Sequence, residues 1–153
     1  MNHAVPRSLI HVDDDPALLR LVSHRLKPHG ITVHSINDPT VAVDAVLTRN
    51  CRLVLLDIDM PKVNGIELLR QIKQADGGVQ AIMLTGIVSL SSAMEAYRVG
   101  AEACFFKPLE KIEPLVDAIT DTFRKIDRWW ETMNRLSQQL RNSRLSSEPV
   151  GAS

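Results

Sequence analysis

The sequence has no net charge, no long hydrophobic run and only two cysteines. Its 18 Lys and Arg residues balance 18 Asp and Glu residues, so the overall charge gives no reason to expect binding to nucleic acid or to an anionic membrane surface. No window approaches the roughly 18 apolar residues of a membrane span. The N-terminal residues MNHAVPRSLIHV also lack the basic start and apolar stretch of a secretion signal. We therefore expect a cytoplasmic protein that binds neither nucleic acid nor membrane.

The two cysteines, Cys51 and Cys104, are too few for a disulfide framework and lack the spacing of metal ligands. Reduced, packed thiols are the more typical state of such residues. The 153 residues have room for one domain with a real core and a short appendage.

Short strand-like segments alternate with segments of helical period. The strand-like segments are rich in branched or aromatic residues and predict strands buried on both faces; they cover residues 8–12, 31–35, 52–57, 79–84 and 103–106. The segments between them place apolar residues three and four apart, as amphipathic helices do; they cover residues 16–26, 39–49, 65–74 and 91–99. The alternation predicts an α/β fold, a parallel sheet with helices on both faces.

The predicted boundaries of these helices carry typical end signals. Asp15 and Asp38 each precede a proline, a pattern typical of an N-cap followed by the first helical turn. Glycines stand where the helices should end, at Gly30, Gly77 with Gly78, and Gly100.

Unusual polar residues follow four of the five predicted strands. They are Asp13 and Asp14 after the first strand, Asp57 and Asp59 after the third, Thr85 after the fourth and Lys107 after the fifth. In open α/β sheets the active crevice lies beyond the carboxyl ends of the strands. We therefore expect these side chains to meet at one edge of the sheet.

Several carboxylates at one edge would raise one another's pKa unless a cation compensated them. Mg²⁺ is the natural candidate, because it prefers oxygen ligands, takes one or two carboxylates and completes its shell with water and phosphate oxygens. Asp57 would then be a nucleophile toward phosphorus that forms an aspartyl phosphate. The metal, the Lys107 ammonium and the Thr85 hydroxyl would share the three phosphoryl oxygens.

The residues also resemble a known family pattern. An acidic pair, Asp13 and Asp14, precedes Asp57 in DIDMPKVNG, then Thr85, and then Lys107 with Pro108. In this order the sequence resembles a response-regulator receiver domain of the chemotaxis-regulator type, the phosphoacceptor half of a two-component pair. The resemblance covers about residues 7–126. It implies a flavodoxin-like, doubly wound, five-stranded parallel sheet of order 2-1-3-4-5.

The resemblance also assigns roles to individual residues. Asp57 would be the phosphoacceptor, supported by Thr85 and Lys107. Asp14 and Asp57 would hold Mg²⁺ directly, together with the backbone carbonyl of Asp59, and Asp13 would act through a metal-bound water. The Lys107–Pro108 peptide would be cis. Family members of this kind are signalling proteins and not enzymes, apart from intrinsic autophosphorylation and autodephosphorylation.

Each motif has an alternative interpretation. Taken singly, the acidic run before a proline is typical of a helix cap and Thr85 of a residue that caps a turn, while Lys107–Pro108 is a common surface dipeptide. The stretch LLDIDMP also resembles the D-x-D signature of haloacid-dehalogenase-type phosphatases, with Asp57 as nucleophile and Asp59 as general acid. Chain order favours the receiver interpretation, because that phosphatase family places its nucleophile strand first and its second acidic cluster late.

Two positions depart from the receiver pattern or vary within it. Receivers usually carry Tyr or Phe three residues before the lysine, where this chain has Cys104. We hypothesise that the output therefore runs through the loop after the fourth strand and the helix over about residues 89–99, with Thr85 and Cys104 as switch residues. Simple packing of Cys104 is the alternative. Asp59 would either repel an anionic phosphodonor or be a solvated charge that points away.

Helical spacing continues beyond the predicted domain. Positions four and three apart are apolar from Ile112 to Leu140, with Trp130 and Met133 among them and a break at Ser137. We predict an extension of the last helix over residues 127–145, for dimerisation or partner binding, and a disordered tail over residues 146–153. Folding of this helix back onto its own domain is the alternative.

The sequence thus predicts a stand-alone receiver that takes a phosphoryl group on Asp57 in an Mg²⁺-dependent reaction. The donor would be a histidine kinase or a histidine phosphotransfer protein, and the signal would pass through protein contacts. A homodimer through the C-terminal helix is expected. A degenerate receiver that serves as a dimeric scaffold, and a receiver cut from a longer regulator, are the alternatives.

Overall fold

Five parallel strands form one sheet in the computed structural model, which describes residues 5–147. The strands are β1 (Ser8–Val12), β2 (Thr32–Ile36), β3 (Leu53–Leu56), β4 (Gln80–Thr85) and β5 (Ala101–Phe106). Their order in the sheet is β2-β1-β3-β4-β5, and every neighbouring pair is parallel. The predicted fold class and strand order are therefore confirmed.

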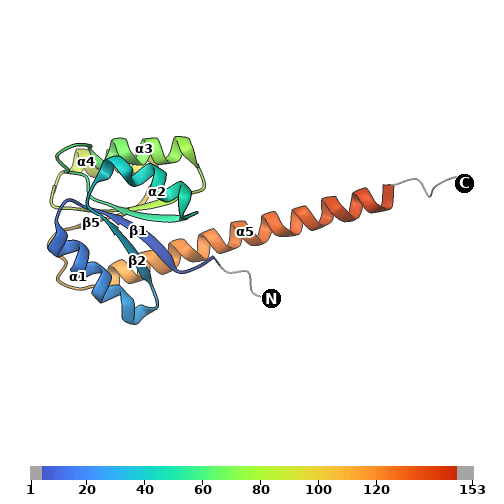
Figure 1. The fold of residues 1–153 in the computed structure, drawn as a ribbon, viewed down its shortest axis with the longest axis horizontal. Coiled ribbons are helices and arrows are strands. Elements are labelled where there is room, and N and C mark those ends of the chain that lie inside the picture. The colour runs from blue at the N-terminus through green and yellow to red at the C-terminus, as the bar shows by residue number, and fades with distance from the viewer. Residues whose placement is uncertain (1–4, 148–153) are drawn as a thin grey trace, which may run out of the picture.

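Helices cover both faces of this sheet. They are α1 (Pro16–Leu26), α2 (Ala42–Thr48), α3 (Gly65–Ala75), α4 (Leu90–Val99) and α5 (Glu113–Ser147), with short 3-10 turns η1 (Lys27–His29) and η2 (Pro39–Val41). Figure 1 shows α2, α3 and α4 on one face and α1 and α5 on the other.

The predicted helix ends are largely confirmed. The Asp15 carboxylate accepts hydrogen bonds from the first turn of α1, and the Asp38 carboxylate accepts one from η2, so both are N-caps. Gly30 and Gly100 take left-handed backbone angles, with φ of 75° and 106°, where α1–η1 and α4 end. The end of α3 differs, because its cap is Asp76 and not a glycine.

Burial on both faces holds for the central strands and fails at the sheet edges. All four residues of β3 are buried, as are most of those of β1 and β4. The edge strands β2 and β5 are instead half-buried or exposed along their length, so our prediction was wrong for these two. Each of them has a neighbouring strand on one side only, which leaves its other side open.

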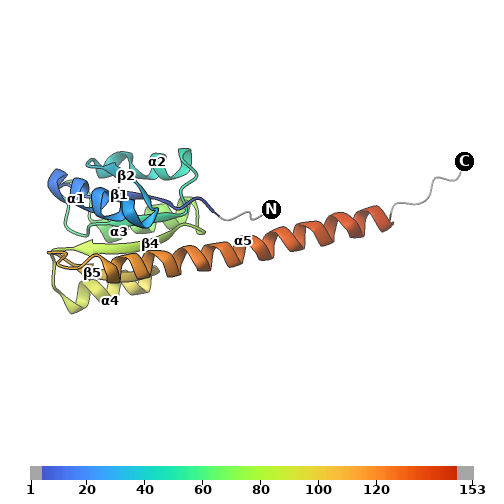
Figure 2. The same ribbon diagram turned by 90° about the horizontal axis from the view of Figure 1, so that it is seen from below.

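Helix α5 packs on the sheet through its first half and then leaves the domain. Its buried residues end at Ile126, and every residue from 131 to 147 is exposed. Figure 2 shows this second half projecting beyond the sheet, so the helix does not fold back. The helix includes Ser146 and Ser147, which we expected in a disordered tail, and residues 148–153 lie outside the described part. We call residues 127–147 the α5 overhang.

The base of the α5 overhang is tied to the start of the chain. Asp127 accepts a hydrogen bond from the backbone N–H of Val5 at 3.0 Å and forms an ion pair with Arg7 at 2.8 Å. The Arg7 guanidinium also lies over the ring of Phe123, 4.9 Å from its centre. These contacts hold α5 where it passes the edge of the sheet.

Among residues 5–147, no helix is both long and apolar enough to cross a membrane.

Candidate phosphoacceptor site

The first residue after each of three strands is fixed by a final hydrogen bond to a neighbouring strand. The backbone N–H of Asp13 donates to Ile36, that of Asp57 donates to Val12, and that of Lys107 donates to Thr85, at 2.9–3.1 Å. Because the strands are parallel, their carboxyl ends meet at one edge of the sheet. The sheet therefore holds Asp13, Asp57 and Lys107 on rigid backbone at the predicted edge.

Lys107 bridges the two buried carboxylates of this edge. Its Nζ lies 2.8 Å from Oδ2 of Asp13 and 3.2 Å from Oδ2 of Asp57. The other oxygen of each carboxylate accepts a backbone hydrogen bond, from Asp15 to Asp13 and from Asp59 to Asp57. One ammonium group thus orders two carboxylates that would otherwise repel each other.

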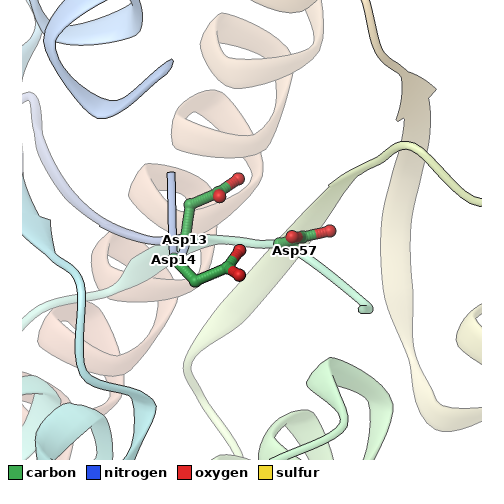
Figure 3. Close-up of side chains that lie close together, drawn as sticks. All are labelled: Asp13, Asp14 and Asp57. Atoms are coloured by element: carbon green, nitrogen blue, oxygen red, sulfur yellow. The ribbon is translucent and has the colours of Figure 1, made fainter. Parts of the chain in front are cut away.

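The third carboxylate belongs to Asp14, which is exposed. Oxygens of Asp13, Asp14 and Asp57 all lie within 4.8 Å of one another, and Figure 3 shows the three side chains gathered at the ends of their strands. Three carboxylates against one ammonium leave an excess of two negative charges. A divalent cation that prefers oxygen ligands fits both this charge and this donor set, so the cluster could hold Mg²⁺.

The surroundings of the site shift the pKa of two groups in it. Burial raises the pKa of Asp57, and the negative charge of Asp13 adds to this, while Lys107 acts in the opposite direction. For Lys107, burial would lower the pKa, but the hydrogen bonds and charges of Asp13 and Asp57 outweigh it and raise the pKa. Lys107 is therefore charged at neutral pH.

His11 is a buried polar residue of the site that our sequence reasoning missed. It is the last residue but one of β1 and is fully buried, and its Nε2 lies 3.9 Å from Oδ2 of Asp13. Burial, together with the charge of Lys107, lowers the pKa of His11 to about 3, so the ring is neutral. A histidine within an otherwise apolar strand, as in SLIHV, is the signal that could have identified it.

The remaining predicted residues are placed less centrally. Thr85 ends β4 at the same edge, fully buried, with its hydroxyl oxygen accepting a hydrogen bond from the N–H of Ile87 at 3.1 Å. The Asp59 side chain is exposed. Cys104 lies within β5, half-buried against the hydrophobic cluster on the α3 and α4 side, and both it and the buried Cys51 are free thiols.

Two backbone features complete the site. The Lys107–Pro108 peptide is cis, as the resemblance implied. Gly65, at the start of α3, packs directly on the backbone of Asp57, and a Cβ atom there would lie only 1.8 Å from the Asp57 carbonyl oxygen. The glycine of DIDMPKVNG is therefore required by the close approach of α3 to the loop that carries Asp57.

The chain is an α/β domain whose parallel sheet presents three clustered carboxylates and a lysine at the carboxyl ends of its strands. The family model described as the response regulator receiver domain matches residues 9–120, and the chain belongs to this family. It is therefore a receiver domain of two-component signalling.

Relatives and solved structures agree with this assignment. The chain is 30% identical over 138 residues to the transcriptional regulatory protein GlrR of Escherichia coli K12, covering 87% of this chain and 31% of that protein. It is 36% identical over 105 residues to the CpxR homolog of Haemophilus influenzae, covering 69% of this chain and 45% of that protein. A CheY-like receiver domain protein from Methanospirillum hungatei superimposes with a TM-score of 0.75 at 26% identity, over 81% of this chain and 98% of that chain. The chain thus spans less than half the length of these two curated relatives.

Proposed function

We propose that the chain is a phosphoacceptor response regulator that takes a phosphoryl group on Asp57 in an Mg²⁺-dependent reaction. The donor would be a phosphohistidine of a histidine kinase or of a histidine phosphotransfer protein. A bond forms between phosphorus and a carboxylate oxygen of Asp57 as the bond to the histidine nitrogen breaks. The observation that carries this proposal is the Lys107 ammonium held between Asp13 and Asp57 beside the exposed Asp14.

The chain's own residues suit the charge changes of this transfer. Asp57 is fixed by its backbone and lies near a cation that can neutralise an incoming phosphoryl oxygen. Asp13, Asp14 and Asp57, with the backbone carbonyl of Asp59, would hold Mg²⁺, which supplies further positive charge for the phosphoryl oxygens. Turnover of an organic phosphomonoester is not expected.

The test is intact-mass analysis after incubation with acetyl phosphate, with and without Mg²⁺. We expect an Mg²⁺-dependent gain of one phosphoryl group, which Asp57→Asn abolishes. Asp59→Asn is the matched control, because it removes an exposed carboxylate and keeps the backbone carbonyl. Faster labelling of Asp59→Asn would indicate that Asp59 repels the donor. Absence of labelling in the wild type despite bound Mg²⁺ would favour a scaffold without phosphotransfer, and sustained phosphomonoester hydrolysis would favour a phosphatase.

The output would pass through the loop after β4 and helix α4. Large apolar side chains are exposed there; they are Val88, Leu90, Met94 and Tyr97, with Phe106 on the adjacent β5. Such a patch is typical of a protein-binding surface. If Cys104→Tyr leaves partner affinity unchanged in both phosphorylation states, position 104 is not part of the switch.

Self-association through α5 is the second part of the proposal. Trp129 is 61% exposed and Leu136 is 53% exposed on a helix that has left its own domain. Leaving such side chains in water is unfavourable, and a second copy of the chain would cover them. Sedimentation over a range of concentrations tests this, and a monomer at the highest concentration would exclude it.

A further inference from the structure

We infer that the α5 overhangs of two copies pair antiparallel, so that the two receiver domains lie at opposite ends of a short helical pair. The inference rests on the self-association proposed above and adds its geometry.

An unbroken apolar stripe runs along the overhang. Its members follow alternating steps of three and four, and those beyond the first are 47–61% exposed; they are Ile126, Trp129, Met133, Leu136 and Leu140. We call these five residues the apolar seam. Our sequence prediction shared Ile126, Met133 and Leu140 with this seam. It followed Trp130 and Ser137 in place of Trp129 and Leu136, one position away, and therefore met a polar break. The seam has the spacing of a two-helix interface.

The seam lies on the side of α5 that faces its own domain. At about 100° per residue, every seam residue lies within about 80° of Ile126, and all of them lie on the same side of it; Ile126 is buried against the sheet. Ile126, Trp129 and Met133 also line a hollow together with Gly77 and Gly78 of the turn between α3 and β4. The apolar seam is therefore the direct continuation of the face that packs on the sheet.

This placement decides the direction of the second helix. In a parallel pair, the second helix would lie on the seam of the first. Followed toward its own N-terminus, it would enter the space that the first copy's sheet occupies. An antiparallel partner brings only the end of its overhang to that sheet and carries its own domain at the far end. At 1.5 Å per residue the overhang is about 31 Å long, enough for each copy to cover the other's seam.

Antiparallel pairing also gives well-matched layers. Trp129 would pack against Leu140 of the second copy, and Met133 against Leu136 of the second copy. The charged residues Arg128, Glu131 and Arg135 lie on the opposite face of the helix, in solvent.

The base of the overhang has room for the end of a second helix. The hollow of about 300 Å³ lined by Trp129 and Met133 of the seam also borders Arg52, between the overhang and the edge of the sheet. The last turn of the partner's overhang would reach this corner. A contact one helix wide is smaller than the roughly 800 Å² per partner of stable complexes, so we expect a dimer that dissociates on dilution.

Disulfide trapping in the full chain tests the direction. Cys51→Ala and Cys104→Ala remove the native thiols, and Trp129→Cys and Leu140→Cys are then made in separate preparations and mixed under mild oxidation. A disulfide requires Cα atoms within about 7 Å. Antiparallel pairing brings residue 129 next to residue 140 of the other copy, and it separates the two copies of residue 129 by about 16 Å. A mixed 129–140 disulfide is therefore expected.

Each other outcome would overturn the inference. Disulfides between identical positions would establish a parallel pair and leave the proposed self-association standing. If no cross-link forms and sedimentation shows a monomer, both the antiparallel pairing and the self-association are ruled out. Leu136→Glu should weaken dimerisation about tenfold or more, whereas Asn142→Glu, which adds the same charge on the far face, should not. Phosphoryl gain on Asp57, measured in parallel, reports separately on phosphotransfer.

Discussion

Replacing Lys107 by methionine tests the electrostatic reasoning about the site most directly. Nζ of Lys107 lies within 3.2 Å of Asp13 and Asp57, whose side chains are 0% and 4% exposed. The variant Lys107→Met keeps the volume and length of the side chain and removes its charge. Two buried carboxylates are then left without their common counter-ion, which we expect to destabilise the metal-free protein.

The magnitude follows from the burial of the three groups. Removing one partner of a buried ion pair costs about 3–5 kcal/mol. The Lys107 side chain is 22% exposed and protonation of Asp57 relieves part of the repulsion, so we expect about 2–3 kcal/mol less unfolding free energy. For a domain of this size, that corresponds to a decrease in Tm of about 8–12 °C.

The assay is thermal unfolding of wild type and variant with and without Mg²⁺. Saturating Mg²⁺, at about 100 times its Kd, adds about 2.7 kcal/mol and should restore most of the loss in Lys107→Met. Lys62→Met is the matched control, because Lys62 meets Asp38 at 3.9 Å on the surface and should contribute little. If Lys107→Met unfolds at the same temperature as Lys62→Met without metal, the carboxylates do not depend on this lysine.

Three further predictions follow from individual contacts. Burial raises the pKa of Asp57 in the folded protein, so its ionised form lowers stability above that pKa. Asp57→Asn should therefore raise the Tm of the metal-free protein at neutral pH. The Tm difference between variant and wild type should shrink as the pH falls through the raised pKa. Gly65→Ala should lower the unfolding free energy by about 3 kcal/mol in urea because of the clash with the Asp57 backbone, whereas Gly86→Ala, with no atom within 4 Å, should not. Asp127→Ala should cost about 1–2 kcal/mol in the same assay through the lost contacts to Val5 and Arg7, and an unchanged midpoint would contradict this.

Sequence reasoning could predict which residues meet at one edge, because parallel strands bring their carboxyl ends together. Knowing that Asp13, Asp57 and Lys107 each follow a strand was enough to place them together, before any distance was available. The sharing of one ammonium between two carboxylates could not be predicted, because it depends on the side-chain conformations of residues 50 and 94 positions apart in the chain. His11 was missed because strand periodicity alone does not distinguish a buried imidazole from an apolar side chain.

The errors in the fold prediction have similar causes. The segments that form β2 and β5 carry branched and aromatic residues like the central strands, but their position at the sheet edges depends on the strand order and not on local sequence. Two positions of the stripe on α5 were assigned one residue off, at Trp130 and Ser137, because Trp129 and Trp130 both continue a helical period. The exposed fractions of Trp129 and Leu136 were needed to identify the apolar seam.

Helix α5 connects the two ends of the molecule. It begins at Glu113, a few residues after Lys107, and runs beneath the sheet to the opposite edge, where the overhang leaves the domain (Figure 2). The loop before it is held by Arg25, which donates a hydrogen bond to the carbonyl of Leu109 at 3.2 Å. Its buried residues from Leu115 to Ile126 pack on the face of the sheet that α5 shares with α1, next to β4 and β5, so one continuous helix joins the two edges. Because the overhang leaves the domain at the edge opposite Lys107, we expect a change at Lys107 to reach the overhang through a displacement of α5 and not through direct contact.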